Sequence, residues 1–176
     1  MTIYRKLPDY IRPNLSVLFV GINPGLRSAQ MGHHFAGPSN RFWKLLYESG
    51  LVTDQLTHQD DWRLPEWGLG LTNVISRSSS GIDVLKPQEY RSGVVRLKRK
   101  VARFRPHIVA LLGVTIFRMI FSPETATPSR LSLGLQTTRL AGVPVFLLPN
   151  PSGRNAHYSY RRTLAAFQAL RHAAQE

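Results

Sequence analysis

The stretch Val17-Leu18-Phe19-Val20-Gly21-Ile22-Asn23-Pro24-Gly25 decides the expected fold, because an apolar run ends abruptly in a polar turn. The pattern recurs near the other end of the chain, where Val145-Phe146-Leu147-Leu148 leads through Pro149 into Asn150-Pro151-Ser152-Gly153-Arg154. Both apolar runs are short and rich in Val and Phe, which predicts buried strands. Ligands of open α/β sheets bind beyond the carboxyl ends of the strands. We therefore expect the two Asn-Pro loops to share one pocket.

Strands and helices are expected to alternate along the chain. Further strands are predicted over 70–75 and 108–112, and the loop-like segment 122–138 leaves room for a short edge strand. Helices are predicted over 40–50, 87–104, 114–121 and 158–174, whereas 21–38 reads as a long loop and 51–67 is ambiguous. This alternation predicts a three-layer α/β sandwich with a mostly parallel central sheet. The length fits a single domain, 1–176, in which 1–15 form an N-terminal arm.

The composition favours a polyanionic partner. Lys and Arg number 23 against 10 Asp and Glu, a net charge of +13, although a basic surface that only aids solubility would give the same excess. The absence of cysteine excludes disulfides, thiolate nucleophiles and Cys-ligated metals. Neither a membrane-length apolar stretch nor a signal region is found in the sequence, so we expect a cytoplasmic protein, acting at the bacterial nucleoid, with no membrane partner.

The first Asn-Pro loop has a plain interpretation as a turn, since Asn, Pro and Gly are the commonest turn residues. Its position after a core strand suggests more: Gly25 permits close approach of a ligand, and the amide of Asn23 can orient a water. Further along, Phe35 is either a core aromatic or a stacking platform for a planar base. The adjacent His33 and His34 lack an evident third ligand, so no metal or other cofactor is expected.

The second Asn-Pro loop could likewise be only a turn between a strand and a helix. Its Asn, Ser, Arg and His side chains would nevertheless suit the gripping of a phosphate backbone, and Arg154 is long enough to probe a duplex. Asp83 is the one acid in the polar loop that follows the strand predicted over 70–75. Most such aspartates cap helices or are solvated, but if Asp83 faces the pocket it could act as a general base.

Taken together, these motifs resemble the mismatch-specific uracil-DNA glycosylase and thymine-DNA glycosylase branch of the uracil-DNA glycosylase superfamily. The resemblance extends from about residue 14 to the C-terminal helix. It is carried by three motifs in order: Gly21-Ile22-Asn23-Pro24-Gly25, Phe35-Ala36-x-Pro38-x-Asn40-Arg41-Phe42-Trp43-Lys44 and Leu148-Pro149-Asn150-Pro151-Ser152-Gly153. The family implies a parallel sheet of about four strands between helices.

The resemblance implies roles for individual residues. Asn23 would position the hydrolytic water, and Phe35 would stack on the flipped base. The base-binding set would be Ile22, Phe35, Ser28 and Gly25. The loop entering the duplex would comprise Asn150, Ser152, Gly153, Arg154, Asn155 and Ala156. Arg154 stands where bacterial relatives often have Leu, and Asp83 departs from the family pattern as a second candidate catalytic residue.

The expected function is therefore that of a monofunctional DNA-repair glycosylase. It would flip uracil, or a related damaged or mismatched pyrimidine as in G·U, out of double-stranded DNA and hydrolyse the N-glycosidic bond. The protein is expected to act as a monomer. Two alternatives remain open on the sequence: a non-catalytic DNA-binding module on the same fold, and a phosphate-handling α/β enzyme, which the lack of Walker or dinucleotide glycine patterns disfavours.

Overall fold

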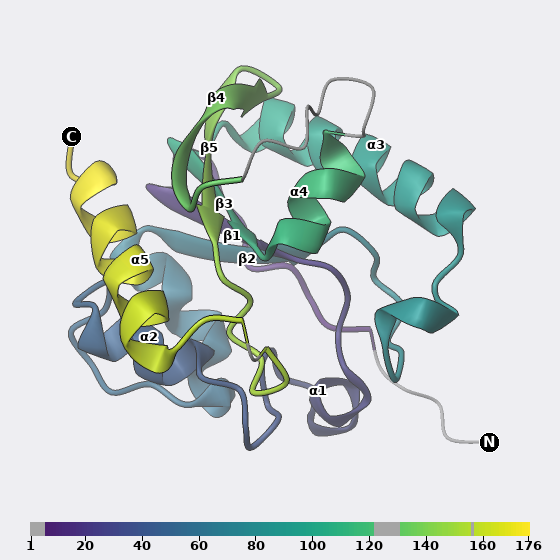
Figure 1. The fold of residues 1–176 in the computed structure, drawn as a ribbon, viewed down its shortest axis with the longest axis horizontal. Helices are drawn as coiled ribbons and strands as arrows, with labels where there is room; N and C mark the ends of the chain where they lie inside the picture. The colour runs from purple at the N-terminus through teal and green to yellow at the C-terminus, as the bar shows by residue number, and fades with distance from the viewer. Residues whose placement is uncertain (1–5, 122–130, 156) are drawn as a thin grey trace.

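The fold is that of a computed structural model, which describes residues 6–121, 131–155 and 157–176. Within these residues, five strands form one sheet in the order β2-β1-β3-β5-β4 (Figure 1). Their bounds are β1 Val17–Gly21, β2 Leu69–Asn73, β3 Ile108–Leu112, β4 Gly134–Leu140 and β5 Val143–Leu148. The α-helices are α1 Leu26–Met31, α2 Phe42–Glu48, α3 Pro87–Phe104, α4 Val114–Ile120 and α5 Tyr160–Ala173, and the 3-10 helices are η1 His58–Trp67 and η2 Ile82–Val84.

Helices cover both faces of this sheet. The helices α3 and α4 lie on one face, and α2 and α5 lie on the other (Figure 1). The four strands β2, β1, β3 and β5 are mutually parallel, and β4 pairs antiparallel with β5. The expected three-layer, mostly parallel α/β sandwich is therefore confirmed, with β4 as a fifth strand beside the four predicted ones.

Apolar side chains at the spacing of each element hold these layers together. The strand β1 is buried at all five positions, as expected for a strand covered on both faces. From it, Phe19 packs edge-on against Phe42 of α2 at 5.3 Å between ring centroids, and stacks at 6.3 Å on Phe167 of α5. On the opposite face, α3 buries Val94, Leu97 and Val101, which follow helical spacing. The core thus fixes the helices on both sides of β1.

Residues of the N-terminal segment lie along the outer edge of β2. Tyr10 and Leu71 exchange two backbone hydrogen bonds of 3.0 and 2.9 Å in an antiparallel bridge. Beside them, Asp9 accepts a hydrogen bond from the Thr72 hydroxyl and pairs with Lys100 of α3. The pairing covers an edge that would otherwise present unpaired backbone groups.

The structure differs from the sequence-based expectation in three segments. The helix α1 lies inside the predicted long loop and ends at Gly32, whose φ of 76° is in the left-handed region. The ambiguous segment forms η1, and β4 is seven residues long rather than a short edge strand. Within the described part of the chain, no helix has the length and apolarity needed to cross a membrane.

Candidate active site

A pocket of about 480 Å³ lies beyond the carboxyl ends of the central strands, where the two Asn-Pro loops meet. This volume is within the range of ligand-binding pockets. Most of the residues predicted for the site line it: Ile22, Asn23, Gly25, Ser28, Phe35, Asn150, Ser152 and Arg154. The expectation of a shared pocket is thus confirmed, and it follows from the sheet order, which places β1 next to β3 and β3 next to β5.

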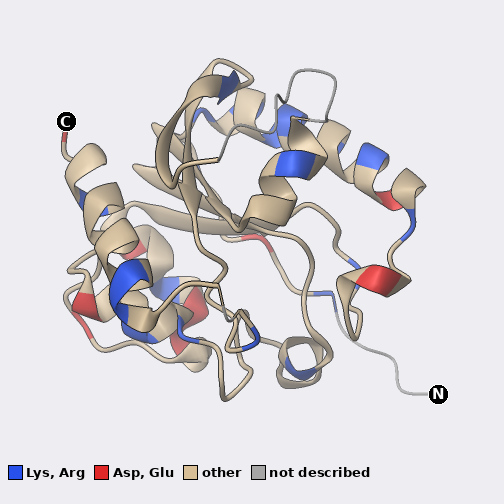
Figure 2. Ribbon diagram, viewed as in Figure 1, with Lys and Arg blue, Asp and Glu red and all other residues tan. Residues whose placement is uncertain are grey.

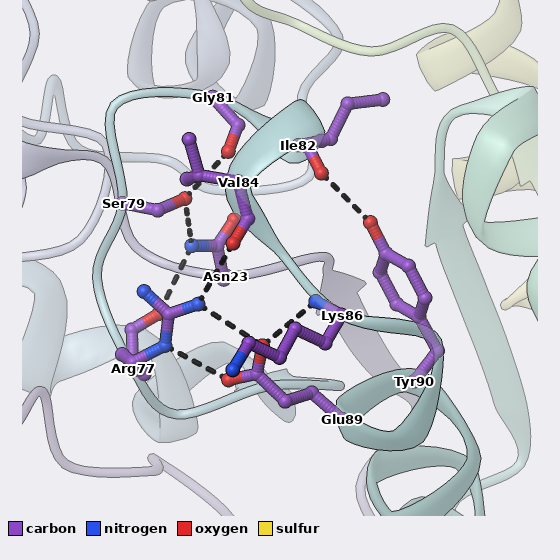
Figure 3. A network of polar contacts seen from close by, with 9 residues as sticks. All are labelled: Asn23, Arg77, Ser79, Gly81, Ile82, Val84, Lys86, Glu89 and Tyr90. Atoms are coloured by element: carbon purple, nitrogen blue, oxygen red, sulfur yellow. Dashed lines mark hydrogen bonds and ion pairs between the residues drawn. The ribbon is translucent and has the colours of Figure 1, made fainter.

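The side chain of Asn23 is held in one orientation by the loop that follows β2 (Figure 3). Its amide nitrogen donates to the backbone oxygen of Arg77 at 2.9 Å and to the hydroxyl of Ser79 at 2.7 Å. A backbone carbonyl can only accept, and the Ser79 hydroxyl already donates to Gly81 O, so both contacts require the NH₂ group. Among the described residues no hydrogen bond to Asn23 Oδ1 is found, which leaves this oxygen as an acceptor for a molecule in the pocket.

An ion pair braces this loop from outside the pocket (Figure 3). The Arg77 guanidinium makes two hydrogen bonds to the Glu89 carboxylate, at 2.8 and 3.0 Å, and a third to the backbone oxygen of Val84. Glu89 also accepts from the backbone N–H of Lys86. The guanidinium, and then that N–H, hold the pKa of Glu89 at about 2, so the brace stays ionised at neutral pH. The brace thereby fixes the carbonyl that orients Asn23.

Phe35 has one ring face supported by the core and lines the pocket. Its ring lies 4.1 Å from that of Phe42, with an interplanar angle of 31°. Its backbone is left-handed, with a φ of 54°, an uncommon conformation for a bulky residue. No hydrogen bond to its N–H is found among the described residues, which leaves that donor available to a ligand. The arrangement can stack a planar group and donate to its edge.

The backbone around Phe35 is anchored on both sides. The buried Ser28 hydroxyl accepts from Ala36 N at 3.1 Å, and the fully buried Asp61 carboxylate accepts from His34 N at 2.9 Å. The ring of His34 lies 2.7 Å from Pro8 O and therefore donates through Nε2. Burial lowers the pKa of His34, which keeps this ring neutral. The anchors hold the strained backbone of Phe35 in place.

The second Asn-Pro loop is shaped by its own side chains and docks on the segment before α2. Asn150 Oδ1 accepts from Ser152 N at 2.9 Å, and Asn155 Nδ2 donates to Asn150 O at 3.0 Å. Gly153 lies so close to Ser39 that a Cβ there would come within 2.5 Å of the Ser39 Cβ. The exposed Arg154 follows directly and lines the pocket, whereas Gly153 and Asn155 do not. The predicted site residue Ala156 lies outside the described residues.

The general-base role considered for Asp83 depended on its facing the pocket, and in the structure it does not line the pocket. Asp83 lies on the exposed turn η2 and is not among the residues lining the pocket, to which its neighbour Ile82 contributes instead. Its carboxylate folds back toward its own turn, since a Cβ on Gly81 would lie 2.6 Å from Asp83 Oδ1. No hydrogen bond between Asn23 and Asp83 is found among the described residues, and only Asn23 lines the pocket.

The sequence interpretation missed several polar residues that line the pocket: Asn40, Asn73, Ser79 and Ser80. Asn73 was expected inside a strand running to residue 75, but β2 ends at Asn73 itself. A polar residue at the carboxyl end of a buried strand was the available signal. The pocket-facing side of the 76–83 loop could not be inferred, because it depends on how that loop folds over β1 through the bridge between Gly25 and Ser79.

The lining of the pocket combines polar and apolar residues and, within the described part of the chain, has no negative charge. Among the described residues that line it, the polar side chains are amides, hydroxyls, arginine and histidine, and none is a carboxylate. In the described ranges 6–121, 131–155 and 157–176, no group of three or more His, Cys, Asp or Glu is arranged to hold a metal ion. The lining residues can form hydrogen bonds, stack on a planar group and orient a water.

Comparison with known proteins places the chain in a family. The chain belongs to the Uracil DNA glycosylase superfamily, whose family profile matches residues 8–174. It is also similar to the solution NMR structure of a "putative Uracil DNA glycosylase" from Methanosarcina acetivorans. The TM-score is 0.64 and the sequence identity 18%, over 98% of this chain and 99% of that one. At that identity the likeness concerns the fold. The family supports the expected DNA glycosylase class and DNA as the partner.

Proposed function

We propose that this protein is a mismatch-specific uracil-DNA glycosylase that removes uracil, or a related pyrimidine, from double-stranded DNA. The observation that carries the proposal is the pairing of an oriented acceptor with an aromatic platform in one pocket. Asn23 Oδ1 is held ready for a water by Arg77 O and Ser79, and Phe35 offers a supported ring face. Arg154 lines the pocket and is long enough to occupy the space that the flipped base leaves in the duplex.

The target nucleotide must leave the base stack before it can enter this pocket. Extrusion costs a few kcal/mol and is easiest for mismatched or damaged pairs, which contributes to selectivity. Arg154, exposed on a loop braced by Asn150 and docked on Ser39, would occupy the vacated space and hydrogen-bond to the orphaned partner base. The flipped pyrimidine would stack on Phe35 and accept from its N–H.

The reaction breaks the bond between N1 of the base and C1′ of the sugar. The electron pair of that bond leaves with the base, whose developing negative charge is stabilised by donors in a pocket without carboxylates. A water donates a hydrogen bond to Asn23 Oδ1, and its oxygen forms the new bond to C1′. The proton released by this water passes to solvent or to the departing base. An amide cannot take the proton itself, so the chemical step is expected to be slow.

The mismatch-specific branch is favoured over other branches by the motif pattern around Asn23 and by Arg154. An amide in the Gly21–Gly25 turn supplies weak activation, which suits a substrate that is already destabilised in the duplex. Asp83 is not included in the mechanism, because it lies outside the pocket.

The test is release of free base from duplexes carrying a single G·U, G·T or A·U pair, measured under single-turnover conditions. We expect uracil release from G·U, faster than from A·U, and its loss in Asn23→Ala with duplex affinity retained. The competing candidate, a non-catalytic DNA-binding module, predicts tight binding to the G·U duplex without release of base. No release from any of the three duplexes by the wild-type protein would overturn the proposal.

A further inference from the structure

A second cavity lies beside the pocket, on the far side of Arg154. This groove has a volume of about 710 Å³ and runs beyond the carboxyl ends of β3 and β5, between the start of α4 and the start of α5. Ile22, Leu112, Asn150, Ser152 and Arg154 line both cavities. Arg154 therefore lies on the boundary between the pocket and the groove.

The groove is strongly cationic. Arg118 of α4 and Arg162 of α5 line it together with Arg154, and all three side chains are exposed. Of the fourteen described residues that line the groove, none is acidic. Figure 2 shows Lys and Arg in blue, with no red, on both α4 and the first turns of α5. Arg162 lies 5.0 Å from the centre of the Tyr158 ring, a cation–π contact that limits its freedom.

We propose that this groove binds phosphodiester groups of the DNA next to the flipped nucleotide, with Arg118 and Arg162 as the contacting residues. The inference rests on the proposed function, which directs Arg154 into the duplex. Whatever duplex surrounds Arg154 must then continue over the groove. Guanidinium groups bind phosphate oxygens through paired N–H donors, and three in one groove without a carboxylate create a strong preference for anions.

The spacing of the two cavities agrees with such a continuation. Most of the pocket lining comes from segments that follow β1 and β2, and most of the groove lining from segments that follow β3 and β5. In the sheet, β3 and β5 are one and two strands further along from β1. Neighbouring strands lie about 4.8 Å apart, so the offset is roughly 5–10 Å. Nucleotides rise by about 3.4 Å along a strand, so the groove lies over phosphates one to three steps from the target.

The first test measures duplex affinity as a function of salt for Arg118→Gln and Arg162→Gln. Arg139→Gln is the matched control, since this substitution removes the same charge. Arg139 lies at the β4–β5 turn, at the end of the sheet opposite to the groove. Each groove variant should weaken binding of the G·U duplex roughly three- to fivefold and lower the salt slope by about one. A salt slope equal to that of Arg139→Gln in both groove variants would overturn the proposal.

The second test identifies the strand that occupies the groove. Neutral methylphosphonate linkages are placed one to three steps from the uracil, either in its own strand or in the complementary strand. Where the linkages replace the bound phosphates, the duplex affinity of wild type should fall, whereas that of the groove variants should fall no further. The strand in which this occurs is the one bound in the groove. If the linkages lower the duplex affinity of wild type and of the groove variants by the same factor in both strands, the groove does not bind those phosphates. Absence of base release by wild type would instead refute the proposed function, whereas these binding measurements would still be interpretable.

Discussion

Asn23 is an amide at a position where a carboxylate would activate water more strongly. Its neighbours explain why an amide fits: Arg77 O is a fixed acceptor that must face an N–H, and a carboxylate would place two acceptors together. The amide therefore activates water less than a carboxylate would, but its Oδ1 is held in a defined orientation.

Removal of the Asn23 side chain should abolish most of the chemistry and spare binding. For Asn23→Ala we expect a fall of about 100-fold or more in the single-turnover rate, because the water loses its positioned acceptor. Ser79→Ala should reduce the rate less, since Arg77 O still holds the amide. A rate for Asn23→Ala within tenfold of wild type would contradict the assigned role.

Asp83→Asn should leave the rate of base release unchanged. The Asp83 side chain is exposed on η2 and does not line the pocket, so we expect solvent to screen its charge and its carboxylate not to contact the reacting atoms. Single-turnover rates of Asp83→Asn and wild type, compared on the same G·U duplex, check this. A marked loss would mean that the loop carrying Asp83 moves onto the pocket when DNA binds.

The buried His34 should make stability fall as the pH is lowered. Its pKa in the folded protein lies below the ordinary value of about 6.5, chiefly because of burial, so the unfolded chain binds a proton more readily. Stability from this group is complete above pH 6.5 and decreases as the pH falls from there toward the folded pKa. Thermal unfolding between pH 8 and pH 5 should show a smaller loss in His34→Gln than in wild type. His157→Gln, an exposed control, should behave as wild type.

Among the elements, α3 shows how closely a helix approaches the sheet. Gly93 lies against the end of β2, where a Cβ would come within 2.3 Å of the backbone oxygen of Val74. Gly93→Ala should therefore destabilise the protein by about 1–3 kcal/mol, the usual cost of overpacking, although alanine is ordinarily the better helix former. Urea unfolding measures the change, with the exposed Ser92→Ala as the control. Stabilisation by Gly93→Ala would refute this packing.

The elements that could be predicted from sequence are those with strong periodicity or a long apolar run. The range of α3 was predicted over 87–104 because Val94, Leu97 and Val101 repeat at helical spacing, and it is confirmed. The six-residue α1 has only Ser28 and Ala29 buried, which is too little pattern to detect. The strand β4 alternates weakly and lies at the sheet edge, so its length depends on pairing with β5 rather than on its own sequence.

On the scale of the whole molecule, the site joins segments that are far apart in the chain. Asn23, Phe35, Ser79 and Asn150 all line the pocket, although more than a hundred residues separate the first from the last. The topology rules for parallel sheets were enough to predict that the two Asn-Pro loops meet. They could not predict which side chains of the loops turn inward, because Asp83 and Ile82 differ only in how one short turn is oriented.

The contacts at the DNA-facing edge also have a kinetic consequence. Arg118, Arg154 and Arg162 would hold phosphates and the gap in the stack, and both features persist after the base has gone. Such contacts bind substrate and abasic product alike, so they favour a long-lived product complex. We expect product release to be slower still than the slow chemical step. Progress curves with excess duplex should therefore show a burst equal to the enzyme concentration, followed by a slower steady phase. Higher salt should quicken the slow phase, and the protein would shield each abasic site until the next repair step begins.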